Sequence, residues 1–130
     1  MQKSSLQFKN PKLVGVELRL NQEFKNIDDG PVDIKVGFDI NVNKLPDSSE
    51  AIVELTVVVG TEDSTNPFYI KATEGAMFRW EKDVKDVDIL LQQNAPAILL
   101  GYLRSVIAML TAVSPYAAYN LPVIDFTKTK

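Results

Sequence analysis

The chain has 130 residues, 45% of them hydrophobic and 24% charged, which fits one soluble globular domain spanning residues 1–130. Its 14 Lys and Arg and 17 Asp and Glu give a net charge of -3, which disfavours nucleic acid as a partner because polyanion binding depends on basic side chains. With no Cys and no His, the chain lacks disulfides, thiolate and imidazole metal ligands and the usual general base.

Four segments alternate apolar and polar residues with the period of a β-strand. They cover Leu13–Leu20, Val32–Val42, Ala51–Gly60 and Phe68–Trp80. This alternation predicts a sheet with one face in water, and such sheets are antiparallel. In the fourth segment we expect a bulge at Gly75 that switches the two faces.

The first strand leads into a polar connection. The side chains of this strand that should face the core are Val14, Val16, Leu18 and Leu20. The connection covers residues 21–31, and its last four residues, Asp28-Asp29-Gly30-Pro31, are typical of a turn.

The longest apolar stretch is Ala95–Val113, whose single charged residue is Arg104. Pro96 falls in its first turn, where proline is tolerated, and Pro115 follows its end. The stretch predicts a long helix that is apolar around most of its circumference. A sheet covers only one side of such a helix, so we expect the remaining apolar arc to contact a second copy of the chain.

A membrane span is the competing interpretation of this helix, because about 20 apolar residues are enough to cross a bilayer. Arg104 would then lie near the bilayer centre, at a cost of about 2.5–3.5 kcal/mol. No cluster of Lys or Arg marks a cytoplasmic end, and the first residues lack the apolar core of a signal peptide. We therefore expect a core helix in a cytoplasmic protein.

The order of elements predicts an α+β fold in which a four-stranded antiparallel sheet packs on one long C-terminal helix. A shorter helix is expected around Val84–Leu91, just before the long one. Residues 116–126 should return in extended or short helical form. From the apolar arc we expect the chain to associate with itself. Its expected interface residues are Ile98, Tyr102, Arg104, Ser105 and Met109.

Carboxylate groups offer little sign of catalysis. Asp28 and Asp29 are adjacent, but turn chemistry explains the pair. A second acidic group consists of Asp83, Asp86 and Asp88. It lacks the glycine and terminal glutamate of a calcium loop, and negative charge at a helix start explains it better. A phosphate-binding glycine loop is also absent, so we expect no enzyme, no metal and no cofactor.

Large apolar residues in irregular segments, and where the fourth strand leaves the sheet, are more informative. Each alone reads as ordinary core, but together they can form an apolar groove for an extended peptide. The groove residues that we predict are Phe24, Ile27, Met77, Phe78, Trp80 and Tyr119.

The second half of the chain resembles the SecB family of bacterial export chaperones. The resemblance starts at FYIKATEGAMFRW and continues through NAPAILLGYLRSVIAMLTAVSPYAAYNLPVIDF, so it covers Phe68–Phe126. The helix start is similar to the Pro-Asn-Ile-Leu-Phe-Pro-Tyr-Ala-Arg pattern of the family. The segment after the helix is similar to Phe-Pro-x-Leu-Asn-Leu-x-Pro-Val-Asn-Phe. The residues that match best are Tyr102, Arg104, Asn120, Leu121 and Phe126.

This resemblance implies a tetramer built as a dimer of dimers through helices and edge strands. It also implies ATP-independent binding of unfolded polypeptides and their delivery to the SecA motor. Two departures weaken SecA as a partner. The family's export members carry a further C-terminal helix and polar tail, and their acidic surface is only weakly matched by a net charge of -3. SecB-like proteins outside export, such as chaperones of toxin–antitoxin systems, fit better.

The sequence therefore predicts a non-enzymatic chaperone that holds unfolded or extended apolar segments of client polypeptides in surface grooves. The alternative is a structural or adaptor protein of SecB-like fold that serves one dedicated partner, for example an antitoxin.

Overall fold

The computed structural model describes residues 5–25 and 32–128. The predicted groove residue Ile27 and the predicted turn at Asp28 and Asp29 lie outside the described residues.

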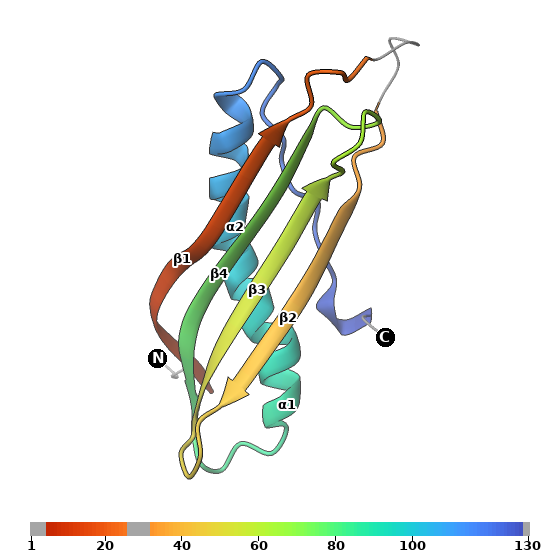
Figure 1. Ribbon diagram of the computed structural model, residues 1–130. Helices are drawn as coiled ribbons and strands as arrows, with labels where there is room; N and C mark the ends of the chain where they lie inside the picture. Colours follow the sequence, from red (N-terminus) through yellow and green to blue (C-terminus); the bar gives the residue numbers. More distant parts are fainter. Residues whose placement is uncertain (1–4, 26–31, 129–130) are drawn as a thin grey trace.

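Four antiparallel strands form one sheet in the order β1-β4-β3-β2 (Figure 1). Their bounds are Leu6–Leu20 for β1, Val36–Lys44 for β2, Glu50–Gly60 for β3 and Phe68–Trp80 for β4. β1 begins seven residues before the predicted start at Leu13, and β2 begins four residues after the predicted start at Val32. The central strands are β3 and β4, and the edges are β1 and β2.

One helix runs behind this sheet (Figure 1). It consists of α1 (Val87–Ile89), a π-helical turn η1 (Leu90–Asn94) and α2 (Ala95–Ala112), and the three parts are continuous. The predicted short helix at 84–91 is thus the first part of the long helix. The predicted α+β architecture is confirmed.

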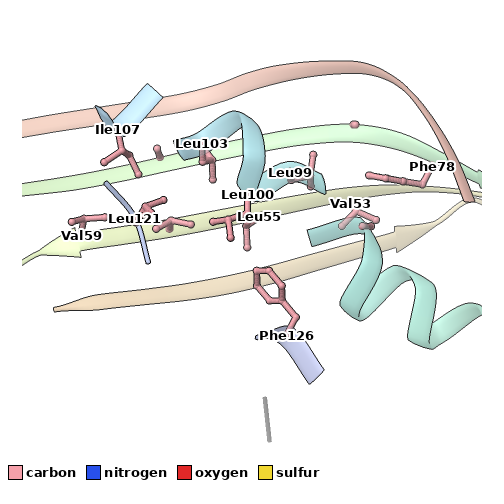
Figure 2. Packing of buried hydrophobic residues seen from close by; sticks show 14 of the residues in the cluster. Val53, Leu55, Val59, Phe78, Leu99, Leu100, Leu103, Ile107, Leu121 and Phe126 are labelled. Atoms are coloured by element: carbon pink, nitrogen blue, oxygen red, sulfur yellow. The ribbon is translucent and has the colours of Figure 1, made fainter. Parts of the chain in front are cut away.

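The core lies between α2 and the two central strands (Figure 2). Leu99, Leu103 and Ile107 of α2 are fully buried against the inner side chains of β3 and β4. The continuous helix is long and apolar enough to cross a membrane by length and composition, with a mean hydropathy of 1.6. Because its buried side chains complete the core of the sheet, we interpret it as a core helix.

The predicted bulge at Gly75 is wrong. The β3–β4 ladder stays in register from Glu50 opposite Arg79 to Gly60 opposite Tyr69. The irregularity lies instead in the neighbouring strand β1, whose pairing shifts between Lys9 and Lys12 and between Leu13 and Gly15.

These shifts change which residues of β1 face the helix. Leu13 lies opposite Glu74, on the helix side of the sheet. Val14 lies on the solvent side, where its Cγ2 would be 3.2 Å from a Cβ atom added at Gly75. The prediction that Val14 faces the core is therefore wrong. Val16, Leu18 and Leu20 do share the face of the buried β4 residues that they pair with.

Thr111 fastens the C-terminal segment to the end of α2. Its side chain is fully buried, its Oγ1 donates to the Ile107 carbonyl oxygen at 2.8 Å, and it accepts from the Tyr119 backbone N–H at 2.7 Å. Ser114 Oγ donates to the Thr111 carbonyl oxygen at 2.6 Å and stabilises the same chain reversal. From there the segment runs back beside the helix (Figure 1) and ends in a 3-10 turn, η2 (Phe126–Lys128).

Glu74 is a carboxyl group inside the sheet–helix core. It points to the helix side of β4, opposite Leu13 of β1 and Leu55 of β3, and it is only 4% exposed. Burial raises the pKa of this carboxyl, because removing water disfavours its charged form.

We expect Thr111→Val to lower the free energy of unfolding by about 1–2 kcal/mol, because the Tyr119 N–H loses its acceptor inside the protein. Urea unfolding followed by circular dichroism measures the loss. Thr73→Val is the matched control. It removes a hydroxyl whose one side-chain partner in the described part of the chain is Thr56 Oγ1, on the solvent side of the sheet, and valine is well tolerated in a strand. Equal losses in the two variants would contradict the role of Thr111.

We expect Glu74→Gln to gain stability over the natural protein as the pH rises. The folded protein holds the Glu74 proton more tightly than the unfolded chain does. The free energy of unfolding of the natural protein therefore falls as the pH rises from the ordinary pKa of 4.5 to the raised pKa of the folded state. Glutamine carries no such penalty. Urea unfolding at pH 4 and pH 7 tests this. Glu54→Gln is the control, because it removes a carboxylate from the solvent side of the sheet. This variant should still lose stability between pH 4 and pH 7, because it retains Glu74. A pH-independent difference between Glu74→Gln and the natural protein would refute it.

Candidate functional site

An apolar surface extends from edge strand β1 onto α2, and we call it the strand–helix surface. It exists because α2 covers β3 and β4 but barely touches β1, so most inward side chains of β1 stay open to solvent, although Leu6 is buried and Leu18 half-buried. Between 39% and 61% of each of its side chains is exposed. Its members are Phe8, Leu13, Val16 and Leu20 of β1 and Tyr102 and Met109 of α2.

Ring contacts join the two halves of this surface. The ring of Phe8 lies 6.4 Å from that of Tyr102 in an edge-on arrangement and 5.8 Å from that of Phe78 beneath it. Beside Tyr102, a hollow of about 400 Å³ is lined by Ile98, Gly101, Tyr102 and Ser105. Gly101 has no neighbour within 4 Å of an added Cβ atom, so the helix surface is open there.

The predicted interface residues divide between two sides of the helix. Ile98, Tyr102, Ser105 and Met109 lie on or beside the strand–helix surface. Arg104 instead contacts the C-terminal segment, where its Nη2 donates to the Pro122 carbonyl oxygen at 3.1 Å. Its Nε is buried and has no hydrogen-bond acceptor within the described residues. The role of all five at an interface stays a prediction.

A second apolar site lies where β1, β4 and the C-terminal segment meet, and we call it the aromatic cluster. Phe24 stands edge-on to Tyr116 at 6.1 Å between ring centres, and Phe68 lies 6.5 Å from Tyr116 and 6.1 Å from Tyr119. Phe68 is buried, whereas the other three rings are half-buried. Burial, with a smaller contribution from Asp33, raises the pKa of the Tyr119 hydroxyl.

The structure distributes the predicted groove residues over three places. Phe24 and Tyr119 both belong to the aromatic cluster. Phe78 is completely buried and Trp80 half-buried at the opposite end of β4. Met77 points to the solvent side of the sheet, since it pairs with Lys9 and Ile52 there. The five described residues therefore do not line one common groove. The sixth, Ile27, lies outside the described residues.

Sequence reasoning missed the apolar residues of β1. Phe8 precedes the predicted first strand, and Val16 and Leu20 were assigned to the core although they are 45% and 41% exposed. The sequence did contain a signal for this exposed edge, because one helix is narrower than a four-stranded sheet. A single helix cannot cover four strands that all have an apolar face, so one edge must remain open.

Acidic groups form no metal site in the described part of the chain, where no cluster of three or more potential ligands occurs. Asp88, one of the three acidic residues near the helix start, pairs with Lys44 Nζ at 2.6 Å on an exposed surface. That contact links α1 to the end of β2 and fits a structural role.

Two solved structures have a similar fold. The SecB-like chaperone of Mycobacterium tuberculosis, in complex with a ChAD peptide from the HigA1 antitoxin, gives a TM-score of 0.73 at 14% identity over 92% of this chain and 91% of that chain. A Streptococcus agalactiae protein of unknown function gives a TM-score of 0.57 at 14% identity over 91% and 97%. No curated protein sequence is similar enough to count as a match.

A family model, described as preprotein translocase subunit SecB, matches residues 11–129. The resemblance seen in residues 68–126 is thereby confirmed and extends to the first strand. This chain belongs to the SecB family.

Proposed function

We propose that this protein is a cytoplasmic, ATP-independent chaperone that binds unfolded or extended apolar segments of other polypeptides and catalyses no reaction. The family supports the chaperone class, and the similar mycobacterial protein is itself a SecB-like chaperone in complex with an antitoxin peptide. The observation that carries the proposal for this chain is the aromatic cluster.

The aromatic cluster suits an extended apolar segment for two reasons. Its rings are only half-buried, so further apolar contact would remove more of their surface from water. Phe24, Tyr116 and Tyr119 also come from irregular segments, which adjust their shape more easily than strands do.

The strand–helix surface suits a second copy of the chain instead. It combines a long helix arc with the edge of a sheet, and a surface repeated on every copy can pair with itself around a twofold axis. A soluble monomer rarely leaves an apolar surface of this kind uncovered, which supports contact with a second copy. We therefore assign Tyr102 and Met109 to self-association, as a homodimer or homotetramer.

The alternative is an adaptor that serves one dedicated partner, and the antitoxin peptide on the mycobacterial chaperone favours an antitoxin for that role. An adaptor would purify with one stoichiometric protein and would not suppress aggregation of unrelated clients. SecA stays a further candidate partner of the export type.

Phe24→Asp should weaken client binding by about 10- to 100-fold, because burying a phenylalanine contributes about 1.5–3 kcal/mol. The measurement is fluorescence anisotropy with a labelled model protein kept unfolded by reduction and alkylation. Val123→Asp is the matched control, since Val123 is 84% exposed and lies outside the cluster. The proposal fails for this site if both variants bind the client as tightly as the natural protein does.

Met109→Asp should lower the mass in solution toward that of a monomer, because a charge placed in a buried interface lacks a partner. Sedimentation equilibrium at micromolar concentration gives the mass. Ile89→Asp is the control, because Ile89 is also an exposed apolar residue of the helix but lies in α1, away from Tyr102. A natural protein that is already monomeric would disprove self-association through this surface.

A further inference from the structure

A third apolar site lies on the solvent side of the sheet, opposite both sites described above. We call it the solvent-face patch, and its apolar members are Val14, Ile52 and Met77. Val14 is 50% exposed and Ile52 is 38% exposed. Their neighbours on the same side include Lys12, Glu54 and Asn41, so the three apolar side chains lie together within a polar face.

The patch is hollowed rather than flat. Two adjoining hollows of about 130 and 140 Å³ share Met77 as a wall. Gly75 lines the larger hollow. A Cβ atom added there would come within 3.1 Å of Glu54 Cγ and 3.2 Å of Val14 Cγ2. Any side chain at Gly75 would therefore crowd Glu54 and Val14, and the open space lies in the hollow between Val14, Ile52 and Met77.

The irregular part of β1 builds one wall of this patch. Asn10 has a φ of 57°, and the two shifts in pairing bring Val14 to the solvent side. In a regular strand Val14 would lie on the helix side together with Val16, and the solvent side would lack this apolar wall. Bulges interrupt ladder hydrogen bonds, and at sheet edges they often re-aim a side chain.

The rim of the patch is positively charged. Lys9 and Lys12 form no ion pair among the described residues. Arg79 is neutralised by Glu50 at 2.9 Å, which leaves Glu54 as the one unpaired carboxylate of the rim among residues 5–25 and 32–128. Two free cations on a chain whose net charge is -3 attract an acidic partner and repel a basic one.

We propose that the solvent-face patch binds an acidic polypeptide segment of a partner protein. One apolar side chain of that segment enters the larger hollow, between Val14, Ile52 and Met77, and carboxylates beside it pair with Lys9 and Lys12. The patch faces away from α2, so this partner and an apolar client can be held at the same time. The site is therefore additional to the proposed client site and does not depend on it.

The test uses fluorescence anisotropy with a labelled peptide in which leucines are flanked by glutamates, and with a second peptide in which lysines replace the glutamates. The acidic peptide should bind, and the basic peptide should not. Lys9→Glu/Lys12→Glu should weaken the acidic peptide about tenfold or more, which is at least 1.4 kcal/mol. Added salt should weaken it as well.

Matched variants separate this site from the rest of the same face. Lys71→Glu reverses a charge on the solvent side of β4 far from the patch and should change binding less than about twofold. Ile52→Ser should weaken binding, whereas Val58→Ser, on the same side of β3, should not. Phe24→Asp should leave the acidic peptide unaffected.

Three results would overturn the proposal. The first is that the acidic and basic peptides bind equally well, or that neither peptide binds. The second is an equal effect of Lys71→Glu and of the paired change at Lys9 and Lys12. The third is a lower mass of the Lys9→Glu/Lys12→Glu variant in sedimentation equilibrium, which would assign the patch to contact between copies of this chain.

Discussion

The packing of α2 on two strands of a four-stranded sheet determines most of what this protein can bind. The core over β3 and β4 fully buries three side chains of the helix, Leu99, Leu103 and Ile107. A helix about 10 Å wide cannot also cover the edges of the sheet. Most inward side chains of β1 and the opposite arc of the helix are therefore left exposed. β2 instead receives partial cover from the C-terminal segment, where the ring of Phe126 lies 5.0 Å from that of Phe38.

The C-terminal segment makes the two sides of the helix unequal. Thr111 and Arg104 hold it along one flank through bonds to Tyr119 and Pro122. The other flank carries Tyr102 and Met109 and has no such cover within the described residues. Because only one flank of the helix is covered, a partner can contact the helix from the other flank alone. The C-terminal segment also places Tyr116 and Tyr119 in the aromatic cluster.

Much of the fold was predictable from the sequence. Period-2 alternation identified β2 and β3 to within a few residues, and the apolar stretch with Pro96 identified α2. The predicted bulge at Gly75 failed because a glycine on a central strand can remain in regular pairing while its neighbour on the edge strand deforms. The predicted groove residues do not share one face, because strand parity separates Met77 from Phe78, and only the register reveals which of the two meets the helix. Their role in binding stays a prediction.

The deformation of β1 also restricts how this sheet can be extended. Beyond the shifts in pairing, Pro11 has no N–H to donate, so the first half of the edge offers an incomplete row of donors and acceptors. Regular pairing resumes from Gly15 to Leu20. Another strand could add to β1 only along that short length, which protects the exposed edge from indiscriminate strand addition and fixes the register of any strand that joins it.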